Sequence, residues 1–313
     1  MILVRSPLRI TLGGGGTDIP SYYRKHGGFT VSATISKYVY IGVVNPFTPG
    51  LYLKHSIIEN VDGVDDVTHP LLRECLKTMG VDRVAVTTFA DIPANTGLGS
   101  SGAFTCALLK ALAVYTRRSM STHDLATLAC DVELYRVGDL GGKQDQFTSA
   151  YGGVNTLAFD PYDGVIVTPL RLSPEVMRDL EDHLMLFYTG VTRTSASVQS
   201  TVGVDDNLHQ VKLLGGQSAN ALSVGAMDMF AEGLNRQWDL KESRVPSPPS
   251  VVELRQRGLH GGALGCKVVG AGGGGFLMFY TPDPSRLRDA LASTPLVETR
   301  FNFDFEGTRV VTT

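Results

Sequence analysis

The stretch PANTGLGSSG, residues 93–102, is rich in the small residues that let a backbone approach a bound anion. Its three glycines allow the chain to bend, and its two adjacent serines provide hydroxyl groups where an apolar-periodic segment begins. Free backbone N–H groups and the positive end of a helix dipole favour a negative group there, so phosphate is the expected ligand. An ordinary glycine-rich turn with a serine cap explains this stretch equally well.

Two more glycine-rich segments lie far away along the chain, GGGGTD at residues 13–18 and GAGGGG at residues 270–275. Runs of four glycines cost conformational entropy, so close approach of backbone to backbone or to a ligand is the simplest explanation for them. Asp18 ends the first run. Taken alone, an aspartate before Ile19 and Pro20 is better explained as a turn residue than as a ligand-binding residue.

A glycine-flanked polar segment, GDLGGKQDQFTSAYGG at residues 138–153, contains Asp145 between two amides. Segments of this kind hold a reacting group more often than a packing group, although a polar loop is the alternative. Glu133 lies just before this segment, near the end of a helix predicted over residues 121–136. A carboxylate near the negative end of a helix either faces water, which is the ordinary case, or meets a cation.

Several common site motifs are excluded by their context. The segment at residues 270–275 also satisfies GxGxxG, but a dinucleotide fingerprint opens a helix, whereas the following residues 276–280 predict a strand and too little chain remains for that fold. A Walker A loop is absent, because GLGSSG lacks the lysine and Lys143 is followed by Gln144. The GxSxG motif of a serine hydrolase does not occur.

Length and composition indicate an ordinary globular protein. The 313 residues suffice for one large or two moderate domains, and the net charge of −3 gives no general attraction to nucleic acid. The four cysteines lie far apart without a CxxC spacing, so we expect buried free thiols and a reducing cytoplasm. No apolar stretch reaches membrane-spanning length, and we therefore expect no membrane partner.

Hydrophobic periodicity predicts the elements that position these segments. A strand over residues 84–89 leads into the first loop described, and a helix over residues 100–115 follows with an apolar stripe along its length, which fixes its N-terminus. The N-terminal half predicts a mixed sheet. The other predicted elements are a strand pair in residues 2–12 broken at Pro7, strands in 29–44 and 51–58, a helix over 71–79, a hairpin of 154–159 and 165–170, strands at 184–188, 267–269 and 276–280, helices within 207–232, 251–256 and 286–291, and a strand over 297–305.

In this order, the three glycine-rich segments resemble those of the GHMP kinase superfamily over essentially the whole chain. PLRITLGGGGTD (7–18) is similar to the family's first motif, PANTGLGSSG to its phosphate-binding loop and VVGAGGGGFLMF (268–279) to its third motif. The resemblance implies a two-domain α+β GHMP kinase fold with the active site in the interdomain cleft. Residues 1–180 would form the N-terminal ATP-binding domain and residues 181–313 the C-terminal domain. It also implies ATP-dependent phosphorylation of a hydroxyl group with Mg²⁺.

The resemblance assigns roles to individual residues. Asp145 would take or orient the proton of the sugar hydroxyl, and Arg9 beside it would keep Asp145 ionised. Ser101 and Glu133 would hold the Mg²⁺ that bridges the ATP phosphates. The residues implied for ATP binding are Pro93, Gly97, Leu98, Gly99, Ser100, Ser101 and Gly102. Those implied for the sugar are Gly15, Gly16, Thr17, Asp18, Gly272 and Gly273.

Within the superfamily, the chain looks most like kinases that phosphorylate the anomeric hydroxyl of D-glycero-D-manno-heptose 7-phosphate in nucleotide-activated heptose biosynthesis. Galactokinase-like sequences have Glu-His where this chain has Gly15 and Gly16, whereas GGKQDQ, YTGVTR and GALGCKVVGAGGGG are similar to the heptose kinases. A substrate that carries its own phosphate needs a cationic clamp. Our hypothesis for the clamp is Lys143, Arg193 and Lys241, which lie in segments expected to face the cleft.

Other functions remain open at this point. The acceptor could be an unphosphorylated sugar such as L-fucose, because the segment SRVPSPPS is less basic than its counterpart in the heptose kinases. A catalytically silent sugar and ATP sensor on the same fold is a second alternative, which the intact set of predicted site residues argues against. An NAD-dependent dehydrogenase is a remote third. We expect ATP and a sugar phosphate as the partners of a monomer or homodimer.

Overall fold

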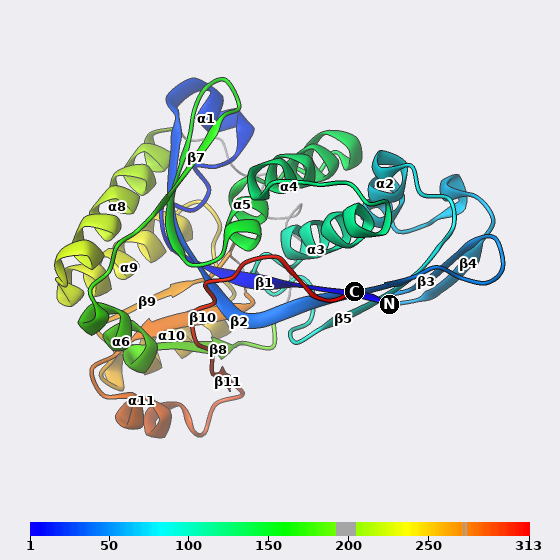
Figure 1. Ribbon diagram of the computed structural model, residues 1–313. Coiled ribbons are helices and arrows are strands. Elements are labelled where there is room, and N and C mark those ends of the chain that lie inside the picture. The colour runs from blue at the N-terminus through cyan, green and yellow to red at the C-terminus, as the bar shows by residue number, and fades with distance from the viewer. Residues whose placement is uncertain (192–204, 271, 273) are drawn as a thin grey trace.

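The computed structural model describes residues 1–191, 205–270, 272 and 274–313. In this part of the chain the strands form one sheet of eight strands and one of four. Figure 1 shows one group of helices beside the larger sheet and a second group toward the smaller sheet, and one helix of the second group, Asp205–Val224, also packs on the larger sheet. The two termini lie side by side, because the last strand pairs with the first.

The larger sheet is mixed, as the sequence predicts. Its strands are β1 (Ile2–Gly13), β2 (Gly28–Val44), β3 (Leu51–Lys54), β4 (Ile58–Val61), β5 (Val84–Ala90), β6 (Val154–Phe159), β7 (Val165–Pro169) and β12 (Arg309–Thr312). The main path runs β12-β1-β2-β5-β3-β4, and β6 pairs with both β2 and β7. Only the pair β3 and β5 is parallel.

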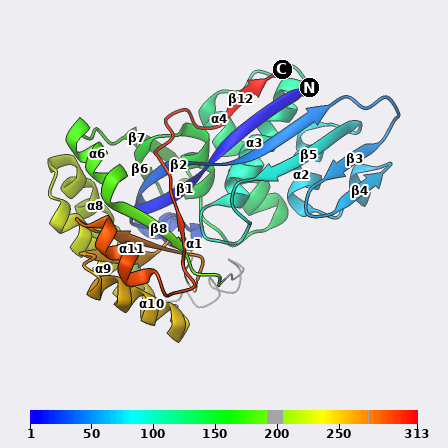
Figure 2. The same ribbon diagram turned by 90° about the horizontal axis from the view of Figure 1, so that it is seen from below.

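The two longest strands, β1 and β2, run from the outer end of the larger sheet toward the second group of helices (Figure 2). The predicted break at Pro7 is wrong, because β1 continues through it. Its pairing with β2 shifts register between Pro7 and Leu8, so the proline lies at an irregularity where a missing N–H is tolerated. Residues 29–44 likewise belong to one strand, since β2 pairs with β1 along its length and with β5 and β6 at its two ends.

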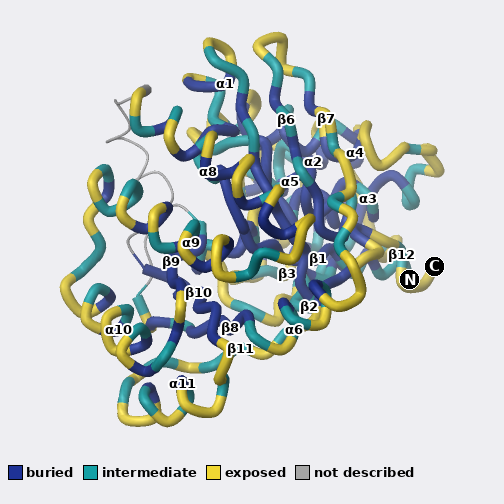
Figure 3. The backbone as a smooth tube through the Cα atoms, turned by 90° about the vertical axis from the view of Figure 1, so that its left-hand side faces the viewer, coloured by how far each residue is buried: buried dark blue, intermediate teal, exposed yellow. Residues whose placement is uncertain are grey.

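The helices of the first group lie by the larger sheet, and one of them is the helix predicted over residues 100–115, after the candidate phosphate-binding loop. They are α1 (Pro20–His26), α2 (Pro70–Met79), α3 (Ser100–Tyr115), α4 (Thr122–Cys130) and α5 (Gln144–Tyr151), with a 3-10 turn at Val64–Asp66 and a π-helix at Asp131–Val137. The bounds of α3 are those predicted. Its apolar residues are buried against β1 and β2, and Figure 3 shows this buried centre. Packing along its length fixes the N-terminus of α3.

The smaller sheet is antiparallel, in the order β11-β8-β10-β9. Its strands are β8 (Leu184–Tyr188), β9 (Gly265–Val268), β10 (Phe276–Tyr280) and β11 (Val297–Thr299). The helices of the C-terminal half are α6 (Pro174–His183), α8 (Asp205–Val224), α9 (Met227–Glu242), α10 (Pro249–His260) and α11 (Pro284–Leu291). Trp238, Phe187 and Phe279 belong to a second apolar core beside this sheet.

Several elements differ from the sequence prediction. Residues 144–151, for which no helix was predicted, form α5, because this short helix buries Phe147 and Ala150 while its polar residues also point inward. The predicted helix over 121–136 changes from α to π at Asp131. The strand predicted over 297–305 is limited to β11, and β12 was not predicted. The helices α1 and α6 were not predicted either. Burial against neighbouring elements stabilises such short helices, and an apolar pattern alone does not reveal it.

The structure also bears on the expectations for the cysteines, the domain division and membrane-spanning segments. The four cysteines are buried and free, as predicted. The division of the chain near residue 180 stays a prediction; the smaller sheet starts with β8, and β12 returns to the larger sheet. Within the described residues, no helix has both the length and the apolar character needed to span a membrane.

Candidate active site

A cavity lies between the two groups of helices, and residues from all three glycine-rich segments line it. Its walls are formed by the start of α3, the π-helix, the start of α5, the end of α9 and the residues around β9. The lining glycines are Gly15, Gly16, Gly97, Gly99, Gly141, Gly142, Gly270, Gly272 and Gly274. The fold therefore brings together three segments that are far apart in the sequence.

Backbone packing explains some of these glycines without any ligand. A β-carbon on Gly270 would lie 2.5 Å from the α-carbon of Gly97, and one on Gly275 would lie 2.1 Å from the carbonyl oxygen of Thr96. No side chain fits in such contacts. The third glycine-rich segment, residues 270–275, thus packs directly against the loop before α3 and fixes the path of that loop.

An ion pair between Arg9 of β1 and Asp145 of α5 lies at the wall of the cavity. The Nε and Nη2 atoms of Arg9 both lie 2.7 Å from Oδ1 of Asp145, and Nη1 donates to the carbonyl oxygen of Gly97 at 2.6 Å. The Arg9 side chain is buried, whereas the Asp145 side chain is 26% exposed. Arg9 therefore joins the loop before α3 to the carboxylate of Asp145 and leaves that carboxylate accessible from the cavity.

The glycines at the start of α3 make room for this ion pair. A β-carbon on Gly99 would lie 3.0 Å from Cγ of Arg9 and 3.2 Å from Cγ of Asp145. A β-carbon on Gly102 would lie 2.8 Å from Cβ of Asp145. Gly99 also has a left-handed φ of 73°, which favours glycine. These glycines let α3 and α5 approach each other, in addition to any role in anion binding.

The N-terminus of α3 has the properties of an anion site. Gly99, Ser100 and Ser101 line the cavity, and no side chain of the described residues caps the helix. The first amide N–H groups of a helix lack partners within the helix, so an anion in the cavity can accept from them. Leu98 is fully buried in the core, and Pro93 and Gly102 do not line the cavity. Their part is to shape the loop.

Glu133 lies on the π-helix and is 3% exposed, so it is not the water-facing residue that its position predicts by default. Its Oε1 atom has no hydrogen-bond partner among the described residues. Burial raises the pKa of Glu133 to about 8, and the charge of Asp145 adds to this, while Thr105 and Gln146 lower it in part. A buried carboxyl group with an unpaired oxygen is suited to meeting a cation.

The oxygen donors near Glu133 fit a hydrated magnesium ion. Ser101 lines the same cavity as Glu133, and carboxylate and hydroxyl oxygens are suitable ligands for Mg²⁺. The described part of the chain has no group of three or more His, Cys, Asp or Glu residues arranged to hold a metal alone. Mg²⁺ commonly keeps several waters and binds through one or two carboxylates plus substrate phosphates, so two protein donors are compatible with it.

Asp18 connects the first glycine-rich segment to α5. Its carboxylate accepts from the backbone N–H groups of Gly16 at 3.0 Å and of Gln144 at 3.1 Å. Burial raises the pKa of Asp18, and the charge of Asp145 raises it further, while the two backbone hydrogen bonds lower it in part. Thr17 lies outside the cavity and donates to the carbonyl oxygens of Gly14 and Phe29. Asp18 therefore holds the start of the helix that carries Asp145.

Three cations line the other side of the site, and the sequence analysis identified only Lys241 among them. Arg244 follows α9 and Lys267 lies in β9. Burial lowers the pKa of Lys241 to about 7, with help from the charges of Arg244 and Arg9, and burial also lowers the pKa values of Arg244 and Lys267. The sequence signal for Lys267 was a lysine inside an apolar strand just before the third glycine-rich segment.

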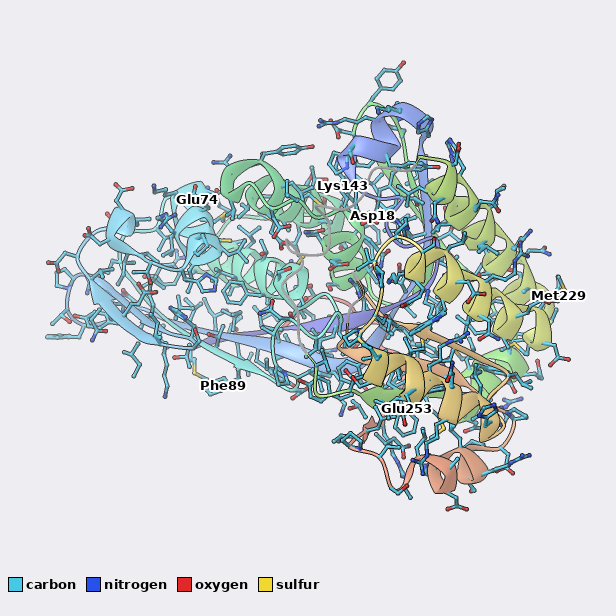
Figure 4. All side chains as sticks on the ribbon, turned by 180° about the vertical axis from the view of Figure 1, so that it is seen from behind. Asp18, Glu74, Phe89, Lys143, Met229 and Glu253 are labelled. Carbon is cyan, nitrogen blue, oxygen red and sulfur yellow. The ribbon has the colours of Figure 1, made fainter. Side chains whose placement is uncertain are left out.

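The structure places Lys143 outside this cavity, which contradicts its expected position in a cationic clamp. Its Nζ atom donates to the carbonyl oxygen of Asp163 at 2.7 Å and lies 3.2 Å from Oδ1 of the same residue. Lys143 precedes α5, so this contact fixes the start of the helix. In Figure 4, Lys143 and Asp18 lie near each other, while Glu74 and Phe89 lie well away from them. Arg193 and Gly273 lie outside the described residues.

Comparisons with known proteins show the family and the fold of the chain. The family models match in two places, GHMP kinases N terminal domain at residues 65–153 and GHMP kinases C terminal at residues 218–295, together more than half of the chain. The chain is 28% identical to "D-glycero-alpha-D-manno-heptose 7-phosphate kinase" of Campylobacter jejuni, over 98% of each chain. It is 27% identical to "L-fucokinase/L-fucose-1-P guanylyltransferase" of Bacteroides fragilis, over 95% of this chain and 37% of that protein. The crystal structure of a D-glycero-D-manno-heptose 1-phosphate kinase from Bacteroides thetaiotaomicron has a TM-score of 0.83 at 24% identity, covering 100% of this chain and 99% of that one.

Proposed function

This chain belongs to the GHMP kinase family, and we propose that it transfers the γ-phosphoryl group of ATP to the anomeric hydroxyl of a heptose 7-phosphate, giving the 1,7-bisphosphate. The observation that carries the proposal is the Arg9–Asp145 ion pair at the wall of a cavity that the start of α3 also lines. The similarity to a heptose 7-phosphate kinase over 98% of both chains supports the sugar.

In this reaction the protein positions the reacting groups and stabilises charge. Asp145 accepts or orients the proton of the sugar hydroxyl, so that the hydroxyl oxygen can attack phosphorus. Arg9 holds Asp145 at 2.7 Å and adds positive charge beside the reacting atoms. The N–H groups at the start of α3 bind the nucleotide phosphates. Asp18 and Gly16 bound the space for the sugar, and Asp18 also fixes α5.

Glu133 and Ser101 would hold the magnesium ion of the nucleotide. The unpaired Oε1 of Glu133 supports this assignment, because a buried carboxylate without a partner is costly unless a cation meets it. When bound, the ion neutralises charge on the transferring phosphoryl group. The assignment of both residues, like that of ATP itself, is part of this proposal.

The proposed function is tested by measuring ADP release with a panel of acceptors. The panel contains D-glycero-D-manno-heptose 7-phosphate, the same heptose without its phosphate, L-fucose and D-galactose. We expect the highest kcat/KM with the heptose 7-phosphate. L-Fucose is the second candidate, because the chain is also similar to a fucokinase. A preference for L-fucose would replace the proposed substrate, and absence of ADP release with every acceptor would favour a silent sensor.

The close packing of α3 on α5 gives a further test of the site. Gly102→Ala should lower kcat by about tenfold, because a shift of α5 misplaces Asp145. The added methyl carbon would lie 2.8 Å from Cβ of Asp145 and 3.0 Å from the amide nitrogen of Gln146. The matched control is Gly216→Ala in α8, where no atom of the described residues outside the local backbone of the helix lies within 4 Å of the added carbon. The control should keep full activity and gain about 0.5–1 kcal/mol of stability. Equal kcat in the two variants would contradict the expected displacement.

A further inference from the structure

The charged groups of the cavity separate by structural element. The carboxylates of Glu133 and Asp145 come from the π-helix and α5, in the first group of helices. The cations Lys241, Arg244 and Lys267 come from the end of α9, the segment after it and β9. On the first side, Arg9 is paired with Asp145. Among the charged residues that the structure describes, the other side carries only cations, and we call Lys241, Arg244 and Lys267 the α9 cation cluster.

Each member of the α9 cation cluster contacts only neutral acceptors among the described residues. Lys241 donates to the carbonyl oxygen of Gly270, Arg244 contacts the carbonyl oxygen of Leu240 at 3.4 Å, and Lys267 donates to Oε1 of Gln237 at 2.7 Å. Within the part of the chain that the structure describes, none of the three forms an ion pair with a carboxylate. No carboxylate of the described residues therefore neutralises their charges.

Three like charges in one cavity wall oppose folding unless something offsets them. Burial lowers the pKa values of all three, and the charges of Arg244 and Arg9 add to the effect on Lys241. The carbonyl end of α9 offsets a small part of this charge. An apolar side chain of similar size would avoid the desolvation cost, so the cluster is unfavourable for folding unless an anion binds to it.

We propose that the α9 cation cluster binds the phosphate group that the acceptor sugar already carries, and that it makes the enzyme select phosphorylated sugars. This inference rests on the proposed function. Arg244 reaches the first glycine-rich segment, since its Nη1 lies 3.9 Å from the position of a β-carbon on Gly16. Lys241 packs on Gly272, whose β-carbon position is 3.2 Å from Cδ of Lys241.

This placement leaves the nucleotide phosphates their own site at the start of α3. The sugar phosphate would extend from Asp145, where its anomeric hydroxyl reacts, past Gly16 to the cluster. Lys241 and Arg244 supply donors that rotate or fork toward a phosphate, and Lys267 adds charge from a more buried position.

The inference is tested with Lys241→Met and Arg244→Gln, which remove charge and keep most of the side-chain volume. Each should raise KM for D-glycero-D-manno-heptose 7-phosphate by about tenfold, the effect of losing a charge-assisted hydrogen bond. KM for ATP and KM for the unphosphorylated heptose should not change. Calorimetric titration of the heptose 7-phosphate without ATP should give the same loss of affinity. The matched control is Arg236→Gln, at an exposed position of α9, the helix that carries Lys241. This control should have the same KM values as the parent.

The outcomes separate this inference from the proposed function. If both variants raise KM equally for the phosphorylated and the unphosphorylated heptose, the cluster does not bind the acceptor phosphate. A rise in KM for ATP alone would lead to the same conclusion. A parent enzyme that prefers an unphosphorylated sugar would also overturn the inference. The parent enzyme could instead prefer a different sugar phosphate, with both variants raising KM for that substrate. In that case the inference stands and the assignment of heptose 7-phosphate as the substrate is wrong. Melting temperatures near that of the parent would show that the variants fold.

Discussion

Asp145→Asn is expected to fold like the parent and to lose about 10²- to 10⁴-fold in kcat, the range for a general acid–base group. The amide oxygen can still accept from Arg9, so the contact that orients the side chain persists. The amide cannot take a proton from the sugar hydroxyl, and it removes the negative charge beside the nucleophile. The measurement is kcat from ADP release with saturating ATP and heptose 7-phosphate, together with the melting temperature.

The control for this variant is Asp182→Asn, which makes the same chemical change at an exposed position of α6. It should leave both kcat and the melting temperature unchanged. A kcat of Asp145→Asn close to that of the parent would remove Asp145 from the chemistry. A matching fall in melting temperature and in activity would instead show that the ion pair with Arg9 serves folding.

Local sequence patterns predicted the elements around the site better than the contacts within it. The bounds of α3 followed from its apolar stripe and from the glycines before it, because both act over short distances. The helix α5 was not predicted, since Gln144, Gln146 and Thr148 are buried in it despite their polarity. Their burial depends on neighbours far away in the sequence, such as Thr11, whose hydroxyl contacts the Gln144 amide.

In the candidate site, too, contacts between residues far apart in the sequence could not be predicted from local patterns. The three glycine-rich segments were found by composition, but the reason for several of them is packing between segments, as for Gly97 against Gly270. Lys143 was chosen for the substrate clamp because its segment was expected to face the cleft, and only the fold reveals its contact with Asp163. Arg244 was missed, since a basic residue in a proline-rich segment carries no local signal. The roles proposed for the site residues stay predictions until variants are measured.

Glu133→Gln should lower kcat by about 10²-fold or more at a fixed magnesium concentration, because metal stabilisation of a transferring phosphoryl group is worth several kcal/mol. The substitution keeps the shape of the side chain and removes its charge. ADP release measured over a range of Mg²⁺ concentrations gives the effect, and we expect a higher Mg²⁺ requirement in the variant. Glu253→Gln, an exposed change on α10 that Figure 4 places away from Asp18 and Lys143, is the control and should match the parent.

The metal-free protein provides an independent readout of Glu133. Burial raises its pKa from 4.5 to about 8, so between these values the folded protein holds a proton that the unfolded chain has released. The contribution of this group to stability is therefore complete below pH 4.5 and is lost as pH rises through 8. Glutamine has no such titration, so Glu133→Gln should become progressively more stable than the parent across this window, with a constant difference above it.

Adding Mg²⁺ at the alkaline end should raise the melting temperature of the parent and not that of the variant, because a ligand stabilises the state that binds it. A difference in melting temperature that does not change with pH would mean that Glu133 ionises as an exposed glutamate does, and the argument for its cation would fail.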